Sequence, residues 1–498
     1  MTAARIVAHG ILLPTIAGAA CVFGFAPFYA WPVPIVALAA LFHVWTKSGS
    51  PLQAALSGFV FGIGYFLAGV SWVFVSLHTF GGMPLVLAAL ATFLFCAYLA
   101  LFPALAGWLV ARFARDRPSA RLALAPAAFT GAEYLRGWLF TGFPWIDLGT
   151  SQVPSSPLAG FAPVFGAYGV SLAVAAAAAI VCAVIASYAW SRARYALVAA
   201  AIVLFGVGGL LRTIEWTEPA GAPVRVALLQ GNVPQQLKWL ERVRTQTLLD
   251  YRRMIFEADA KVIVLPETSL PAFLDQLPPD YVESIRAHTA ATGKIVLMGT
   301  VEREKADTYF NSLVRFASGP FATYRKRHLV PFGEYVPPGF KWVLAVLHIP
   351  LSDFEKGPQV QAPLEAGGLT FGVAICYEDV FGSEVIDALP AATALVNVSN
   401  DAWFGESFAA DQHLQASQTR ALESGRWMVR ATNTGASAAV DEKGRVVARL
   451  APFVHGTLIA EVTPRQGMTP YARWGDIAAL VLIAAVAFAV ARRARKRS

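Results

Sequence analysis

Long apolar stretches dominate the first 215 residues of the chain and return once near its C-terminus. A helix needs roughly 20 predominantly apolar residues to cross the hydrocarbon core of a bilayer. Segments of this kind lie at 9–28, 33–46, 54–77, 84–111, 122–140, 163–189, 195–211 and 474–491, although the second is short enough to be partly re-entrant. The pattern therefore predicts an α-helical membrane bundle of about eight transmembrane helices.

The pattern changes between the seventh and eighth apolar segments. Short β-rich runs such as "VRVALLQGNV", "KVIVLPETSL", "LTFGVAICYED" and "ATALVNVSN" alternate there with helical or turn-rich stretches. That alternation is typical of a layered α/β domain. We thus expect a membrane region with seven helices at 1–215, an extracytoplasmic catalytic domain at 220–467, a C-terminal transmembrane helix at 474–491 and a basic cytoplasmic tail at 492–498.

Composition agrees with a membrane protein, since 56% of the 498 residues are hydrophobic and only 14% are charged. The net charge of +8 would otherwise suggest a nucleic-acid partner. Its distribution argues against one, because the basic residues cluster at every second membrane exit. Short loops rich in Lys and Arg stay on the cytoplasmic side. We therefore expect both termini in the cytoplasm, the 220–467 domain on the opposite side, and no nucleic-acid partner.

Cysteine placement singles out one thiol. Cys21, Cys96 and Cys182 fall in predicted spans, whereas Cys376 is the one cysteine of the exported domain and has no disulfide partner there. A lone thiol in such a domain is a candidate reactive group. Because free cysteine is also among the most buried residue types, a simple packing role for Cys376 stays open.

Two other residues of this domain suit acyl chemistry. Glu267 follows the apolar run "VIVLP", and Lys326 lies in "YRKRHLVPFGE". A thiol that attacks a carbonyl needs a base to take its proton and a cation or N–H donor to stabilise the oxyanion. Glu267 and Lys326 can fill these roles. Taken singly, a helix-capping or surface role for Glu267 and a solvated position for Lys326 are equally reasonable interpretations.

The region 224–450 resembles the carbon-nitrogen hydrolase, or nitrilase, superfamily, in which a Glu-Lys-Cys triad occurs in this chain order. The strings "LLQGNVPQQLKW", "LPETSLPAF", "KRHLVPFGEYVP", "GVAICYEDVF" and "LVNVSNDAWFG", with the apolar spans, extend the resemblance to the membrane-bound apolipoprotein N-acyltransferase family. The resemblance implies an α-β-β-α sandwich with Glu267 as general base, Lys326 as oxyanion-stabilising lysine and Cys376 as nucleophile.

The same resemblance implies supporting or substrate-binding roles for Trp239, Glu334, Tyr377 and Glu378. Glu334 could keep Lys326 charged, since an opposite charge nearby favours the ammonium form. From the residues alone, Glu378 could equally be a surface carboxylate and Trp239 an ordinary packing aromatic.

The resemblance further implies an enzyme of the bacterial inner membrane with its catalytic domain on the periplasmic side. It would take an acyl chain from a phospholipid as a thioester on Cys376 and pass it to the amino group of the diacylglyceryl-cysteine of apolipoproteins. No cofactor or metal is expected, and His328 and His413 are interpreted as loop or surface histidines because neither has metal-ligand spacing.

Two rival functions remain open at this point. A membrane-anchored amidase or nitrilase-type hydrolase would use the same triad but pass the acyl group to water, and a transporter or sensor would only bind ligand. Two further features have functional and structural interpretations. The apolar segment "GFKWVLAVLHIP" (339–350) is either a lid over the site or core packing, and Glu133 with Arg136 is either an intramembrane site or a local ion pair.

Overall fold

The computed structural model describes residues 8–114, 117–187, 191–305, 308–337, 339 and 353–495. Within these ranges the chain forms two compact units. A helical unit comprises 8–74, 86–214 and 473–495, and an α/β unit comprises 75–85 and 215–472. The apolar segment expected as a lid lies outside the described residues, apart from Gly339.

The helical unit is built from apolar helices separated by short turns. They are α2 (Leu13–Ala20), α3 (Pro32–Lys47), α4 (Pro51–Val70), α6 (Leu85–Ala114), α7 (Pro118–Arg136), α8 (Ala162–Ala186), α9 (Arg192–Leu211) and α15 (Ile477–Arg495). Among the residues that the structure describes, four helical stretches are long and apolar enough to cross a membrane, namely Pro51–Val70, Leu85–Ala114, Pro157–Ala186 and Arg192–Leu211. The unit thus has the character of a membrane protein.

Helix α7 differs from its neighbours because it carries buried charge. Arg136 donates to Asp147 Oδ1 at 2.6 Å and to the carbonyl oxygens of Phe143 and Trp145 at 2.7 and 2.8 Å. Glu133 lies farther from Arg136, at 3.7 Å, and accepts a hydrogen bond from the Leu148 amide. Arg136 is therefore paired mainly with the loop after α7, and its contact with Glu133, the local ion pair considered from the sequence, is the longer one.

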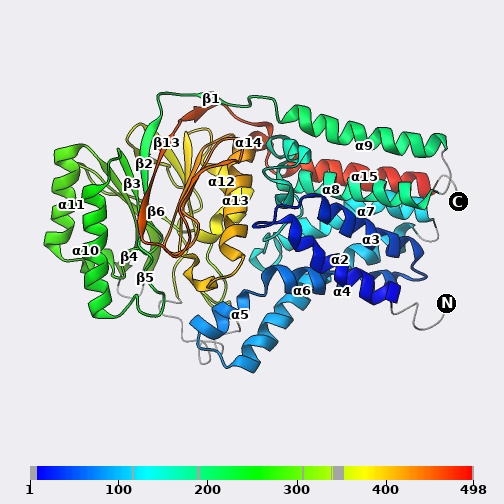
Figure 1. Cartoon of the computed structure of the whole chain (residues 1–498), viewed down its shortest axis with the longest axis horizontal. Helices are drawn as coiled ribbons and strands as arrows, with labels where there is room; N and C mark the ends of the chain where they lie inside the picture. The colour runs from blue at the N-terminus through cyan, green and yellow to red at the C-terminus, as the bar shows by residue number, and fades with distance from the viewer. Residues whose placement is uncertain are drawn as a thin grey trace. The chain divides into compact units, whose positions relative to one another are not determined.

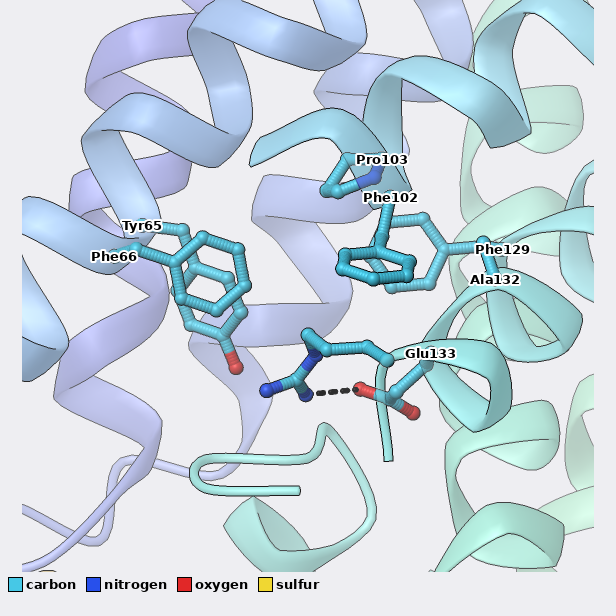
Figure 2. A pocket seen from close by; sticks show the side chains of 8 residues that line it. Tyr65, Phe66, Phe102, Pro103, Phe129, Ala132 and Glu133 are labelled. Atoms are coloured by element: carbon cyan, nitrogen blue, oxygen red, sulfur yellow. Dashed lines mark ion pairs between the residues drawn. The ribbon is translucent and has the colours of Figure 1, made fainter. Parts of the chain in front are cut away.

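This charged pair lines a small pocket inside the helical unit. Figure 2 shows Glu133 joined by an ion pair to a guanidinium beside a group of aromatic side chains, and the partner in this pair is Arg136. The other lining residues are Tyr65, Phe66, Phe102, Pro103, Phe129 and Ala132. The guanidinium of Arg136 is already hydrogen-bonded to a carboxylate and two carbonyl groups. These bonds hold the loop at 143–148 in place.

Two six-stranded sheets form the centre of the α/β unit. The first has the order β13-β2-β3-β4-β5-β6 and the second has the order β12-β11-β10-β9-β8-β7. The first comprises β2 (Val224–Gln230), β3 (Val262–Val264), β4 (Ile295–Lys305), β5 (Thr308–Phe316), β6 (Ala322–Arg325) and β13 (Gly456–Val462). The second comprises β7 (Leu364–Ala366), β8 (Leu369–Ile375), β9 (Ala394–Ser399), β10 (Met428–Thr432), β11 (Ala438–Val440) and β12 (Val446–Arg449).

Alternation along the strands explains how the sheets pack. Val226 and Leu228 of β2 lie in a core shared with the second sheet, whereas Ala227 and Leu229 lie in a core shared with helices. Successive side chains of a strand point to opposite faces of its sheet, so a strand covered on both faces is apolar throughout.

Helices cover the outer faces of the two sheets. Figure 1 shows α10 (Glu241–Glu257) and α11 (Pro279–Thr292) beside β2 to β5, where their apolar residues join the first sheet's outer core. Helix α13 (Ala409–Ser424) packs Leu414 and Ala421 against the second sheet. The expected α-β-β-α sandwich is therefore confirmed.

Smaller elements complete the α/β unit. They are α12 (Gly382–Val385) and the two-stranded sheet of β1 (Glu218–Pro219) and β14 (Arg465–Gln466). Two further short helices, α5 (Val73–Val75) and α14 (Pro470–Trp474), contain the points of the sequence where one unit ends and the other begins. More important for the site are the parallel trios, β2-β3-β4 in the first sheet and β8-β9-β10 in the second. Parallel strands present their carboxyl ends at one edge, which is where ligands bind in open α/β sheets.

Candidate active site

The carboxyl ends of strands from both sheets supply the three residues singled out from the sequence. Glu267 follows β3, Lys326 follows β6 and Cys376 follows β8. Lys326 shares the edge of the parallel trio because β6 pairs antiparallel with β5, which in turn pairs antiparallel with β4. Tertiary structure thus brings together three residues that are spread over 109 positions of the chain.

Glu267 is buried and fully engaged by hydrogen bonds. Its Oε1 accepts from Asn311 Nδ2 at 2.7 Å and from Lys326 Nζ at 3.3 Å, while its Oε2 accepts from the Asn400 amide at 2.9 Å. Only 6% of the residue is exposed. A surface or helix-capping role for Glu267 is therefore excluded, and its carboxylate is held in one orientation.

Lys326 lies between two carboxylates. Its Nζ donates to Glu334 Oε1 at 2.8 Å as well as to Glu267, and the residue is 1% exposed. Burial alone would disfavour the ammonium ion, but the two carboxylates outweigh it and hold the pKa of Lys326 above its ordinary value. The solvated position considered for Lys326 is therefore wrong, and its side chain is a fixed, buried cation.

Asn311 links the two acidic partners of this lysine. Its Nδ2 donates to Glu267 Oε1 at 2.7 Å and to Glu334 Oε1 at 3.0 Å. Glu334 Oε2 accepts from the amide of Val330 at 2.9 Å, which fixes the loop after Lys326. Sequence reasoning missed Asn311, although a polar residue in the middle of the strand sequence "TYFNSLVRF" is the signal that marks it.

Cys376 is held in an unusual backbone conformation. Its φ is +53°, in the left-handed region that non-glycine residues seldom adopt. Strain of this kind, of order 1–3 kcal/mol, clusters at functional sites. The residue is also partly exposed, unlike the other three cysteines, which are buried. Both observations argue against a role in packing alone.

The surroundings of Cys376 keep its sulfur protonated at rest. Burial of the thiolate and the charge of Glu267 raise the pKa of Cys376 well above its ordinary value, although Lys326 and Ser399 act in the opposite direction. The opposing effects of Glu267 and Lys326 indicate that both groups lie close to the sulfur. A thiol in this state is a poor nucleophile unless a base takes its proton.

Glu378 connects the lysine loop with the cysteine turn. Its Oε1 accepts from the amides of Arg327 and His328 at 2.7 and 3.1 Å, and its Oε2 accepts from the amide of Ile375 at 2.7 Å. Tyr324 donates to Oε2 at 3.2 Å. With 2% exposure, Glu378 is no surface carboxylate. Burial raises its pKa to about 7, against the effect of the backbone amides.

Tyr377 and Trp239, the two other residues expected to support the site, differ in their surroundings. The ring of Tyr377 packs edge-on against Phe381 and His328, with centroids 5.1 and 5.7 Å apart. Trp239 lies in the loop between β2 and α10 and is 37% exposed. Its neighbour Lys238 is buried.

Lys238 is a second buried lysine that sequence reasoning did not identify. It is 2% exposed, and its Nζ donates to Thr268 Oγ1 at 2.8 Å, directly after Glu267. Burial lowers the pKa of Lys238 to about 8, while the carboxylate of Glu267 acts against this change. Thr268 has a φ of +41°. Lys238 therefore fixes the strained turn that carries Glu267.

The two histidines differ from each other. His328 is partly buried, stacks on Phe381 with ring centroids 3.8 Å apart, and places Nδ1 2.7 Å from Glu384 Oε1. His413 is fully buried in α13. The interpretation of His413 as a loop or surface residue is therefore wrong. The helix that carries it is rich in polar residues, but the side chain of His413 is buried.

Comparisons with known proteins agree with this architecture. Residues 225–471 match the carbon-nitrogen hydrolase family, and residues 17–180 match the family described as the apolipoprotein N-acyltransferase N-terminal domain. The α/β unit is thus a carbon-nitrogen hydrolase domain carried by a chain with a second, helical region.

Full-length relatives define the family more narrowly. An apolipoprotein N-acyltransferase of Nitrosomonas europaea is 49% identical over 94% of this chain and 94% of its own length. Proteins of the same name from Methylococcus capsulatus and Vibrio cholerae are 45% and 38% identical over 98% of this chain and 96% and 99% of their own lengths. The chain belongs to the apolipoprotein N-acyltransferase family.

Proposed function

We propose that this chain transfers an acyl chain from a membrane phospholipid to the N-terminal amino group of the diacylglyceryl-cysteine of apolipoproteins. The observation that carries this function is near-complete similarity to apolipoprotein N-acyltransferases, which includes the helical region as well as the hydrolase domain. The hydrolase alternative, a membrane-anchored amidase, is not favoured because it accounts for the 225–471 region alone.

In the first half of the proposed reaction, Cys376 attacks the ester carbonyl of the phospholipid. Glu267 takes the thiol proton, and the ammonium of Lys326 stabilises the oxyanion that forms. Collapse of the tetrahedral intermediate breaks the ester C–O bond, and Glu267 returns the proton to the leaving lysophospholipid oxygen. The acyl group remains on Cys376 as a thioester. The raised pKa of the thiol supports base-assisted attack over a preformed thiolate.

In the second half, the amino group of the apolipoprotein attacks the thioester carbonyl. Glu267 accepts a proton from the amine, an amide bond forms, and the sulfur of Cys376 leaves and is reprotonated. Glu334 keeps Lys326 oriented and charged, Glu378 and Tyr377 fix the turn of the nucleophile, and Trp239 contributes an exposed aromatic surface for substrate. No metal or other cofactor is required by this scheme.

The membrane arrangement proposed here has eight spans. The seven helices of 1–215 and the one at 474–491 would keep both termini and the 492–498 tail in the cytoplasm, and the 220–467 domain on the periplasmic side of the bacterial inner membrane. Alternation of basic loops supports this orientation. Since exposing an acyl chain to water costs about 0.8 kcal/mol per CH₂, a site held at the membrane surface suits two lipid substrates.

Intact-mass spectrometry of the purified full-length protein after incubation with phospholipid vesicles tests this function. We expect a fatty-acyl mass increment that hydroxylamine removes, because hydroxylamine cleaves thioesters. The increment should vanish in Cys376→Ala and persist in Cys96→Ala, a matched control in the helical unit. An increment in Cys376→Ala, or hydrolysis of small amides without any increment in the wild type, would contradict the proposal.

A further inference from the structure

Four ionisable side chains are buried together behind the cysteine turn. Asp379 and Asp401 contribute carboxylates, Arg430 a guanidinium and His413 an imidazole, and each side chain is at most 1% exposed. Arg430 lies 3.2 Å from Asp379 and 2.9 Å from Asp401. We call these four residues the buried ion cluster. Burying such groups is costly unless all are paired, so their arrangement needs an explanation beyond stability.

The cluster reaches the nucleophile through His413. Its Nε2 lies 3.1 Å from the carbonyl oxygen of Cys376 and 2.8 Å from Asp379 Oδ1. Both neighbours are acceptors, so Nε2 must carry the hydrogen and donate to them. On the other side of the ring, Nδ1 is 2.9 Å from Asp401 Oδ1 and 2.6 Å from Arg430 Nη2. Asp379 and Asp401 therefore hold the imidazole from both sides and direct its Nε2–H toward the carbonyl oxygen of Cys376.

Electrostatics favours a charged ring in this position. Burial and the neighbouring Arg430 both disfavour an imidazolium, but the carboxylates of Asp379 and Asp401 outweigh them and raise the pKa of His413. With His413 protonated, two positive and two negative groups balance within the cluster.

A second donor acts on the same carbonyl oxygen. Asn397 Nδ2, on β9, donates to the oxygen of Cys376 at 3.0 Å, and Asn397 Oδ1 accepts from Arg430 at 2.7 Å. Two donors therefore fix the peptide that follows a residue with φ of +53°. Because hydrogen bonds that over-determine a strained residue allow it to persist, these donors can hold the left-handed turn.

We propose that His413, held by Asp379, Asp401 and Arg430, is a positioning residue that locks the carbonyl of Cys376 and thereby aims its thiol at the substrate carbonyl. This inference rests on the proposed function in one respect, namely that Cys376 is the nucleophile. The consequence is a defect in the chemical step, with no change in substrate binding, when the carbonyl loses its donors.

The test uses the full-length protein in phospholipid vesicles and measures thioester formation on Cys376 at varied donor concentration. His413→Leu removes the donor, His413→Gln offers an amide donor near the same place, and Asn397→Asp loses the second donor while keeping an acceptor for Arg430. Gln418→Leu is the matched control, because Gln418 is buried in the same helix but bonds the carbonyl of Gly444. Thermal unfolding is recorded for every variant.

We expect His413→Leu and Asn397→Asp to lower kcat about 10- to 100-fold at unchanged KM, since a misplacement of about 1 Å can cost that much. His413→Gln should recover most of the loss, and Gln418→Leu should keep wild-type kcat even where it lowers the unfolding temperature. If His413→Leu does not fold, Asn397→Asp and His413→Gln decide the matter alone. A raised KM, or a kcat that simply follows stability across all variants, would overturn the proposal.

Alkylation of Cys376 by iodoacetamide separates this inference from the proposed function. The alkylation reaction requires a well-placed thiol but no acyl donor. We expect slower alkylation in Asn397→Asp and His413→Leu than in Gln418→Leu. Slow alkylation in these variants combined with no thioester in the wild type would refute the acyltransferase chemistry and leave the positioning role intact. Alkylation at the wild-type rate would refute the positioning role.

Discussion

Replacing Lys326 by methionine tests the electrostatic design of the site most directly. Glu267 Oε1 and Glu334 Oε1 lie 3.3 and 2.8 Å from the same Nζ, so the two oxygens are at most about 6 Å apart. Without the lysine, the buried carboxylate of Glu267 and the partly buried carboxylate of Glu334 face each other. At an effective dielectric constant of ~20, two like charges at this distance repel by about 3 kcal/mol. This repulsion agrees with the free energy of about 3–5 kcal/mol that is lost when one member of a buried ion pair is removed.

We therefore expect Lys326→Met to lower the free energy of unfolding by about 3–5 kcal/mol and to abolish thioester formation. Adding Glu334→Gln removes one of the two facing charges. The double variant should regain much of the lost stability, but it should stay inactive because no oxyanion donor has returned. Lys261→Met, which changes an exposed lysine of the same unit, is the control.

Unfolding in detergent micelles, followed by tryptophan fluorescence, and intact-mass measurement of the acyl-enzyme give the two readouts. Stability and activity should separate in the double variant. If that variant forms the thioester at the wild-type rate, Lys326 has only a structural role. If Lys326→Met is as stable as Lys261→Met, the repulsion derived from the geometry is absent and the reasoning fails.

Three further predictions concern the support of the triad. In the wild type, the free energy of unfolding should rise between about pH 8 and 10.5 by up to about 3 kcal/mol relative to Lys238→Met. The reason is that, in this pH range, the unfolded state binds the proton of Lys238 more tightly than the folded state does. Parallel pH curves for the two proteins would contradict this. Glu378→Gln should lose about 1–3 kcal/mol of stability, since its amide would face the N–H of Ile375; unchanged thermal unfolding would show that this bond is unimportant. Trp239→Ala should raise KM for lipid without altering stability, because its side chain is partly exposed; steady-state kinetics with an unchanged KM would remove it from the substrate surface.

Similarity of motifs was sufficient to place the chain in its family and to imply the sandwich, and the short apolar runs were sufficient to predict a layered α/β domain. Runs such as "VRVALLQ" are covered on both faces, and their length and β-branched composition mark them as strands even without knowledge of their partners. The count of eight spans stays a prediction. Helix α7 shows why such counts are difficult, since Arg121, Glu133 and Arg136 reduce its hydropathy although all three are buried by partners elsewhere in the unit.

The sequence by itself determined the candidate chemistry, because Glu267 and Cys376 end apolar runs where α/β folds place their ligands and Lys326 lies between them in the chain. Only the tertiary structure decided the environment of these groups. Burial between two carboxylates makes Lys326 a fixed cation, and the turn at Cys376 is held by donors from β9 and α13. His413 shows the difference most clearly, since nothing local in "AADQHLQAS" reveals burial at the nucleophile. Apolar periodicity is encoded locally, whereas the charges that meet inside a fold depend on which distant strands become neighbours.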